Sequence, residues 1–195
     1  MDCLAASLRP KRFLHTLGVA NMAANLAMMH EDVSLQRAKL AGLLHDCAKY
    51  LTNEEIFALC EKLEIPLSES EKSTPAVIHG KLGAKLAVLR YGIEDDEICS
   101  AIACHTTGKS QMTTLEKIIY IADYIEPNRE KAPNLAKIRQ TAFYDIDECM
   151  YEILRDTLEY LGKNPKTLDP ETKDAFEFYR QLHETKQQEK KESAL

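Results

Sequence analysis

The chain has 195 residues, of which 45% are hydrophobic and 29% charged, and its formal net charge is −6. This length and composition are typical of one soluble globular domain. The acidic balance argues against a nucleic-acid polymer or an anionic membrane as partner, because both require a basic face. No apolar run approaches the roughly 20 residues of a membrane span, and residues 1–12 lack the pattern of a secretory signal, so we expect a cytoplasmic protein.

Apolar residues recur at helical spacing along nearly the whole chain, and no segment shows the convincing alternation of a strand. The predicted helices cover residues 10–30, 35–46, 52–63, 79–91, 94–104, 113–125, 135–142, 145–161 and 170–184. Seven glycines and seven prolines leave little material for the many tight turns of an all-β fold. The sequence therefore predicts an all-α fold, an irregular helical bundle.

Several helix ends are marked by their residue types. The pairs Thr52 with Glu55 and Thr113 with Glu116 have the spacing of a capping box, which predicts a helix start at each. Gly92 is expected to close the helix before it. Gly162, with Pro165 just beyond, is expected to do the same in a left-handed C′ conformation. The run 169–171 (Asp-Pro-Glu) predicts the start of the last helix.

We expect a single domain over residues 1–185. Residues 186–195 (KQQEKKESAL) have no apolar face, which predicts a charged and disordered tail. The polar residues 68–75 are predicted to form a surface loop. The six cysteines are scattered without a Cys-x-x-Cys pair, which favours reduced thiols packed in the core. The sequence does not determine the oligomeric state, although apolar faces on the last two long helices could support a homodimer.

Six ionisable side chains lie where the pattern predicts burial beside apolar helix faces. They are His15, His45, Asp46, His79, His105 and Asp123. An ionised carboxylate within a segment such as IIYIADYI is costly to bury without a cation or several donors. Any one histidine alone is more often a core or capping residue. One metal site explains all six together, since imidazole nitrogen and carboxylate oxygen suit iron, manganese or zinc.

The same residues carry a family resemblance. Their order along the chain is similar to that of the HD-domain metal phosphohydrolases. The words around them (RFLHTLGVA, GLLHDCAK, HGKLGA, HTTGK and ADYIEPNR) most closely resemble the YqeK-type branch, the symmetrical bis(5'-nucleosyl)-tetraphosphatases. The resemblance runs from about Arg12 to the last helix. It implies the helical HD-domain bundle and an enzyme that hydrolyses diadenosine tetraphosphate to two ADP with metal-activated water.

Carried over position by position, the resemblance implies a role for each of the six residues. His15, His45, Asp46 and Asp123 would hold one metal ion, with iron expected and manganese or zinc as alternatives. His79 and His105 would hold a second ion or contact the phosphates. The site would then be mono- or dinuclear, and Asp46, His79 and His105 are the expected catalytic residues.

Basic and hydroxyl side chains near these ligands are expected to bind the phosphates of the substrate. The expected set is Arg12, Lys49, His79, His105, Thr106, Thr107, Lys109 and Arg129. For Lys81 we favour a solvated surface charge. Glu126 is predicted either to orient Arg129 or to fix the turn at Pro127, and the sequence favours neither.

Three alternatives stay open at this point. The protein could be an HD phosphohydrolase acting on another nucleotide or phosphoester, or a non-catalytic nucleotide-sensing module. The buried aspartates and histidines could also be purely structural hydrogen-bonding groups. One departure from the family pattern concerns the substrate: Ala175-Phe176-Glu177 replaces the usual Ala-Tyr-Asn. This exchange removes a tyrosine hydroxyl and an amide that could serve at the nucleoside end.

Overall fold

The computed structural model describes residues 2–162 and 169–193, and all regular elements in these two ranges are helical. The prediction of an all-α fold is therefore confirmed. The elements in chain order are α1 (Asp2–Ser7), α2 (Pro10–Ala27), α3 (Leu35–Leu44), α4 (Asn53–Lys62), α5 (Glu69–Ser73), a short 3₁₀ turn η1 (Pro75–Val77), α6 (His79–Tyr91), α7 (Asp96–Cys104), α8 (Thr114–Ile125), α9 (Leu135–Thr141), α10 (Ile146–Leu161) and α11 (Pro170–Glu192). Over these described stretches, no helix is both long enough and apolar enough to cross a membrane.

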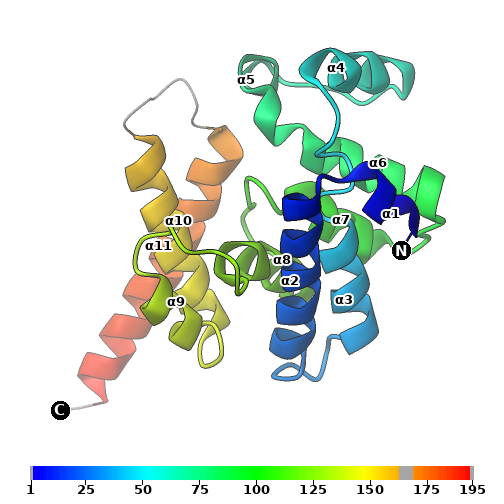
Figure 1. Cartoon of the computed structure of the whole chain (residues 1–195). Coiled ribbons are helices and arrows are strands. Elements are labelled where there is room, and N and C mark those ends of the chain that lie inside the picture. Colours follow the sequence, from blue (N-terminus) through cyan, green and yellow to red (C-terminus); the bar gives the residue numbers. More distant parts are fainter. Residues whose placement is uncertain (1, 163–168, 194–195) are drawn as a thin grey trace.

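Helix α8 lies at the centre of the bundle, with α2 and α3 on one side and α10 and α11 on the other (Figure 1). Its sequence is apolar on nearly every side, and Ile118, Ile119, Ile121 and Ile125 are all 0% exposed. Burial of each such side chain contributes roughly 1.5–3 kcal/mol. The helix that carries Asp123 is therefore held rigidly in the core.

Two glycines allow neighbouring helices to approach unusually closely next to predicted site residues. A Cβ atom at Gly42 would lie 2.8 Å from the Cα atom of Ala20. Any larger residue at this position would therefore push α3 away from α2. A Cβ atom at Gly80 would lie 2.6 Å from the carbonyl oxygen of Ala103, where α6 meets α7. These contacts fix the backbone close to His45 and His79.

Most predicted helix ends agree with the structure. Thr52 and Thr113 both form complete capping boxes, and Gly92 closes α6 in the left-handed conformation with φ 67°. The left-handed conformation predicted for Gly162 is wrong. This residue has φ −59° because its N–H still bonds to the carbonyl of Leu158, at 2.7 Å, in helical geometry. Pro165 lies outside the described residues.

The surface loop predicted for residues 68–75 is also wrong, because helix α5 covers most of it. Ser68 and Glu71 form a third capping box, although no apolar run follows to reveal it in the sequence. Glu71 is buried and pairs with Lys81, whose Nζ lies 2.7 Å from its carboxylate. Lys81 is therefore an ion-paired residue and not a free surface charge.

The ends of the chain carry more helix than we expected. Helix α1 was not predicted, and Leu4 and Leu8 are buried against the core. Helix α11 continues to Glu192, six residues beyond residue 186, where the disordered tail was predicted to start. Lys186 bonds to Asp145 at 2.7 Å, and the following Gln, Glu and Lys residues are strong helix formers. Residues 186–192 are thus helical, and the charged tail stays a prediction.

Candidate metal centre and substrate cavity

The six residues predicted as metal ligands come together from five helices. His15 projects from the middle of α2, and Asp123 from the last turn of α8. His45 and His105 are the C-cap residues of α3 and α7, and His79 is the first residue of α6. All four histidines and Asp46 are at most 9% exposed, whereas the side chain of Asp123 is 27% exposed. Residues 108 positions apart in the sequence thus form one cluster.

Each histidine ring is anchored through Nδ1, which leaves Nε2 directed into the cluster. Three rings bond to the carbonyl three residues earlier, with a distance of 2.7 Å in each case: His45 to Gly42, His79 to Ala76 and His105 to Ile102. His15 Nδ1 lies 3.1 Å from the carboxylate of Glu126. An Nδ1–H that donates to such an acceptor leaves the lone pair on Nε2, which is the usual arrangement of a metal-binding imidazole.

Asp46 lies between two pairs of these rings. Its Oδ2 atom is 3.4 Å from His45 Nε2 and 3.8 Å from His15 Nε2. Its Oδ1 atom is 3.1 Å from His79 Nε2 and 3.8 Å from His105 Nε2. The donor atoms fall into overlapping groups, one of His15, His45 and Asp46 and another of Asp46, His79 and His105. One carboxylate can therefore serve two neighbouring cations.

The ionisation of the cluster fits a cation. Burial would raise the pKa of Asp46, but the adjacent His45 and His105 rings lower it well below its usual range. Burial likewise opposes ionisation of Asp123, whose pKa is lowered by His15 and His45. Burial lowers the pKa of His79 to about 4 despite the nearby carboxylate of Asp46. At neutral pH the cluster therefore offers two carboxylates and at least one neutral imidazole.

Hydrogen bonds within the protein do not satisfy every buried nitrogen atom of the cluster. The Nε2 atoms of His15 and His45 have no hydrogen-bond partner, and an unpartnered buried polar atom costs roughly 1–3 kcal/mol. The Nε2 atoms of His79 and His105 lie only 3.1 Å apart. A metal ion would satisfy these lone pairs, so the residues present fit a first-row transition metal with nitrogen and oxygen ligands.

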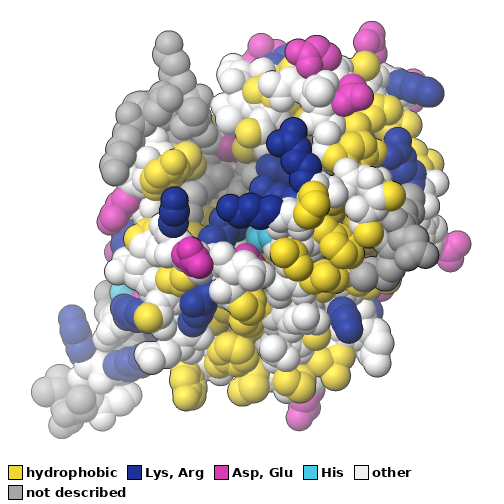
Figure 2. All heavy atoms as spheres, viewed as in Figure 1, with side chains coloured by type: hydrophobic (Ala, Val, Ile, Leu, Met, Phe, Trp, Pro, Cys, Tyr) yellow, Lys and Arg dark blue, Asp and Glu magenta, His cyan; other side chains and the backbone are white. Residues whose placement is uncertain are grey.

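A cavity of about 300 Å³ opens above the cluster and brings basic side chains to it. Arg12 Nη1 is 2.8 Å from Asp46 Oδ2, and Arg129 Nη2 is 2.9 Å from Asp123 Oδ1. Lys49 Nζ lies 3.1 Å from His79 Nδ1, and Thr106 Oγ1 lies 3.3 Å from His105 Nε2. Figure 2 shows Lys and Arg side chains gathered around a hollow in which a histidine is visible. The chemistry offered is that of a metal site with phosphate-binding cations.

Comparison with known proteins identifies the family. The model of the HD domain matches residues 12–128, which include all six cluster residues. The chain belongs to the HD domain family. It is 34% identical over 172 residues to "Bis(5'-nucleosyl)-tetraphosphatase, symmetrical" of Bacillus subtilis, covering 88% of this chain and 91% of that protein. It is 36% identical over 174 residues to the protein of the same name from Staphylococcus aureus, with 88% of each chain covered.

A solved structure of this HD domain family supports the architecture. It is the crystal structure of a "predicted HD superfamily hydrolase involved in NAD metabolism" from Clostridium acetobutylicum. The two chains superpose with a TM-score of 0.88 and 35% sequence identity, covering 93% of this chain and 95% of the other. The resemblance inferred from the motif words is thus confirmed for the whole fold.

Two residues predicted to bind substrate do not lie at the HD cluster. Lys109 pairs with the buried carboxylate of Glu116 at 2.7 Å, because that carboxylate needs a cation. Thr107 bonds to Glu171 at 3.2 Å and to the carbonyl of Gly108. Neither side chain lines the cavity above the cluster, although Thr107 lines a neighbouring one. Proximity to His105 in the sequence therefore did not bring either side chain to the cavity directly above the cluster.

Glu126 has a role that sequence reasoning missed. Its Oε1 atom contacts His15, and its Oε2 atom accepts hydrogen bonds from the backbone N–H (2.7 Å) and side-chain amide (3.0 Å) of Asn128. The turn-fixing interpretation is therefore correct, while the side chain orients His15 and not Arg129. A Cβ atom at Gly18 would lie 2.3 Å from Oε2, so only glycine leaves room for this carboxylate. No pattern in the sequence connects Glu126 with His15 and Gly18.

The departure from the family pattern at Phe176 and Glu177 lies away from the cluster. Phe176 stacks on Tyr151 with ring centroids 5.9 Å apart, and Glu177 pairs with Arg180 at 2.5 Å on the surface. Neither residue lines the cavity above the cluster. Leu168 falls outside the described residues. Cys47 and Cys104 are buried free thiols that pack beside the cluster, as expected, and are absent from the groups that could hold a metal.

Proposed function

We propose that the protein is a metal-dependent bis(5'-nucleosyl)-tetraphosphatase that hydrolyses diadenosine tetraphosphate symmetrically to two ADP. The observation that carries this proposal is the set of four inward Nε2 atoms and two carboxylates beneath a cavity lined by cations. The relatives from Bacillus subtilis and Staphylococcus aureus carry the name of this activity over most of their length. The same relatives make a dinucleoside polyphosphate the proposed ligand and ADP the proposed product.

Iron is the proposed metal, with manganese or zinc as alternatives, in a mononuclear or dinuclear site. His15, His45, Asp46 and Asp123 would hold one ion, and Asp46, His79 and His105 would hold the second. When bound, the metal supplies Lewis acidity, which acidifies water and polarises a phosphoryl oxygen. The donor set supports nitrogen and oxygen coordination but does not choose among these metals.

The side chains above the cluster are proposed to bind and orient the polyphosphate. Arg12 and Arg129 can each hold phosphate oxygens bidentately, and the hydroxyl of Thr106 can donate one further hydrogen bond. Burial lowers the pKa of Lys49 and the nearby carboxylate of Asp46 opposes this shift, so an anion bound beside Lys49 would favour its charged form. His79, with a pKa of about 4, offers a lone pair and not a charge at pH 7.

The proposed reaction is the addition of one water molecule across the central anhydride of the substrate. The water oxygen forms a bond to the second phosphorus from one end, and the bond from that phosphorus to the central bridging oxygen breaks. One ADP gains the new P–O bond, the other leaves with the bridging oxygen, and the protons of water are shared between the products and solvent. Fixed cations stabilise the charge that develops on the phosphoryl oxygens.

Product analysis tests the symmetry of cleavage. Purified, iron-loaded protein is incubated with diadenosine tetraphosphate, and the nucleotides are separated by chromatography while metal content is measured on the same sample. We expect ADP alone. Equal amounts of AMP and ATP would refute symmetrical cleavage, and a metal-free protein whose activity resists chelators would refute the metal site.

A second candidate is an HD phosphohydrolase with another nucleotide as substrate. It is favoured by the solved relative from Clostridium acetobutylicum, whose description names NAD metabolism. A panel of nucleotides in which diadenosine tetraphosphate is hydrolysed slowest would support it. A non-catalytic sensing module is tested with Asp46→Ala, which we expect to abolish hydrolysis. Retained hydrolysis with lost nucleotide binding would refute the catalytic proposal.

We also propose that the protein acts in the cytoplasm, which is supported by five described cysteines that are all free. The homodimer stays a prediction. The apolar faces of α10 and α11 that suggested it pack on each other, and α10 also packs on α8 and α9. Light scattering after size-exclusion chromatography measures the mass directly.

A further inference from the structure

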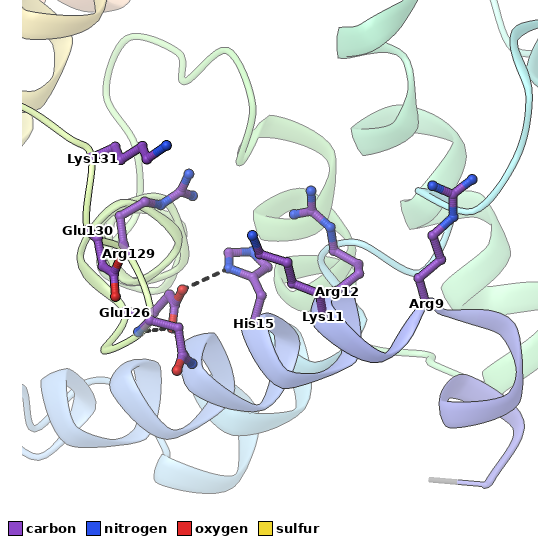
Figure 3. Close-up of a pocket in the computed structure, with 9 residues that line it drawn as sticks. Arg9, Lys11, Arg12, His15, Glu126, Arg129, Glu130 and Lys131 are labelled. Atoms are coloured by element: carbon purple, nitrogen blue, oxygen red, sulfur yellow. Dashed lines mark hydrogen bonds and ion pairs between the residues drawn. The ribbon is translucent and has the colours of Figure 1, made fainter.

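A second cavity, of about 450 Å³, lies beside the cluster between the start of α2 and the segment after α8 (Figure 3). Arg9, Lys11 and Arg12 line it from α2 and the residue preceding it, and Arg129 and Lys131 face them from the other side. Five cations and two carboxylates line it among the described residues, and one of the carboxylates, Glu126, is buried and contacts His15. The cavity is therefore strongly basic in a chain of net charge −6.

Three of these cations are free of protein partners. The side chains of Arg9, Lys11 and Lys131 are exposed, and none forms an ion pair or hydrogen bond with any residue of the two described ranges. Some cations elsewhere are ion-paired: Arg37 and Lys117, for example, lie within 2.9 Å of a carboxylate. Like charges held together repel one another, so a bound polyanion would be stabilised by all three at once.

The basic cavity adjoins the site above the cluster, since Arg12 and Arg129 line both. A third cavity, of about 600 Å³, shares Lys49, Thr106 and Thr157 with the site and none of its described lining residues with the basic cavity. The described lining of the third cavity includes the apolar residues Val77 and Leu161 and the ring of Tyr160. The site above the cluster therefore adjoins one cavity lined by charge and another lined partly by apolar and aromatic groups.

We propose that the basic cavity is an anion subsite for the phosphates of the leaving nucleoside diphosphate, the half of the substrate beyond the cleaved bond. This inference rests on the proposed function. The described residues that line the basic cavity include no Phe, Tyr or Trp, so recognition there is of phosphate charge and not of the base. The other nucleoside is held on the side of Tyr160. A chemically symmetrical substrate is thus bound by two different halves of the site.

The test uses the variant Lys11→Ala/Lys131→Ala, whose two lysines are exposed and touch no proposed metal ligand. The matched control is Lys39→Ala/Lys62→Ala, which removes the same charge from two exposed lysines on α3 and α4. The probe is diadenosine tetraphosphate with a methylene group in place of the central bridging oxygen. Its Kd for the metal-loaded full chain is measured by isothermal titration calorimetry.

We expect the Kd to rise roughly tenfold in Lys11→Ala/Lys131→Ala, since two partly exposed ion pairs are lost. The control should stay within about twofold of wild type. KM for the substrate should rise in parallel while kcat changes little. An unchanged Kd, or an equal loss in the control, would overturn the subsite.

This design separates the subsite from the proposed function. Normal production of ADP by wild type, together with an unaffected Kd in the lysine variant, would refute the subsite alone. Wild-type protein that binds the probe with the expected loss in the variant, yet releases no ADP from the substrate, would refute the function alone.

Discussion

Glu126 determines which nitrogen of His15 can bind a metal. Its carboxylate lies 3.1 Å from Nδ1, which favours the proton on that atom and leaves Nε2 directed into the cluster, where Asp123 Oδ1 is 3.0 Å away. A carboxylate behind a ligating histidine also raises the basicity of the ring. Gly18 provides the space for Glu126. The orientation of His15 as a metal ligand therefore depends on two residues that are not themselves proposed ligands.

Glu126→Ala is therefore expected to lower metal affinity about 10- to 100-fold, the usual range for loss of such a partner. Gly18→Ala should have a similar effect, because its methyl group would displace the carboxylate. Glu126→Gln keeps an acceptor oxygen and should recover most of the affinity. Competition against a metal-sensitive chelator measures all three.

Glu130→Ala is the matched control, since it removes an exposed carboxylate from the same segment. Each variant is also unfolded in urea without metal. Equal metal affinity in Glu126→Ala and Glu126→Gln would contradict the positioning role and leave only a structural one.

Among the helices, α3 and α7 are locked together at the end opposite their histidines. Asp95 caps α7 by accepting from the N–H groups of Glu97 and Ile98, at 3.1 and 3.2 Å. Its two oxygens also accept hydrogen bonds from Nε and Nη2 of Arg37 on α3, at 2.7 Å each. His45 and His105 stand at the far ends of these two helices, so this contact helps to set their separation.

Asp95→Ala should destabilise the metal-free protein by about 1–2 kcal/mol at pH 7, from loss of the cap and of a half-exposed ion pair. Arg37 lowers the pKa of Asp95. Its contribution is therefore complete above the ordinary Asp pKa of roughly 4 and is lost as the pH falls through the lower folded-state pKa. Urea unfolding at several pH values should show the difference from wild type shrinking below about pH 4.

Asp96→Ala, one residue later and exposed, is the control and should change stability by less than about 0.5 kcal/mol. A difference between Asp95→Ala and wild type that stays constant down to pH 3 would contradict the ion pair as its cause.

Helix signals in the sequence succeed where a cap and an apolar run agree. The boxes at Thr52 and Thr113 precede apolar residues, and the helices start at the next residue in both cases. The same spacing at Ser68 precedes no apolar run, since α5 has only five residues. This helix is held instead by the ion pair of Glu71 with Lys81. That pair joins distant elements, so local pattern could not predict it.

The candidate site divides in the same way. The six cluster residues could be predicted because a polar group on an apolar helix face is costly wherever the helix packs. Lys109 was misplaced because its partner is a buried carboxylate, and burial of Glu116 follows from packing and not from sequence distance. The sequence did not single out Arg9, Lys11 and Lys131, because it does not distinguish a cation that lines a cavity from one on the open surface.

The cluster also ties the molecule together, because its ligands come from α2, α6 and α8 and from the ends of α3 and α7. An ion that binds only the folded state stabilises it by about 2.7 kcal/mol at a concentration of 100 times Kd. Chelation should therefore lower Tm by roughly 5–10 °C for a chain of this size.

Differential scanning calorimetry on chelated and reloaded protein measures this change. Asp46→Asn, which weakens the ligand set, should show a much smaller shift. Equal Tm values for chelated and reloaded wild type would contradict a metal that bridges these helices.

The basic cavity makes the charge distribution of the molecule uneven, because its cations are gathered at one place while the chain as a whole carries −6. The net negative charge repels a polyanion while the cations of the basic cavity attract it, so productive encounters are guided to the site. We expect kcat/KM for the tetraphosphate to fall steeply as NaCl rises from about 20 to 200 mM, since screening shortens this guidance to roughly 10 Å or less. The dependence should flatten in Lys11→Ala/Lys131→Ala, whereas equal slopes would contradict guidance by these residues. An acidic protein can in this way capture a highly charged anion quickly without presenting a basic surface to every other polyanion in its surroundings.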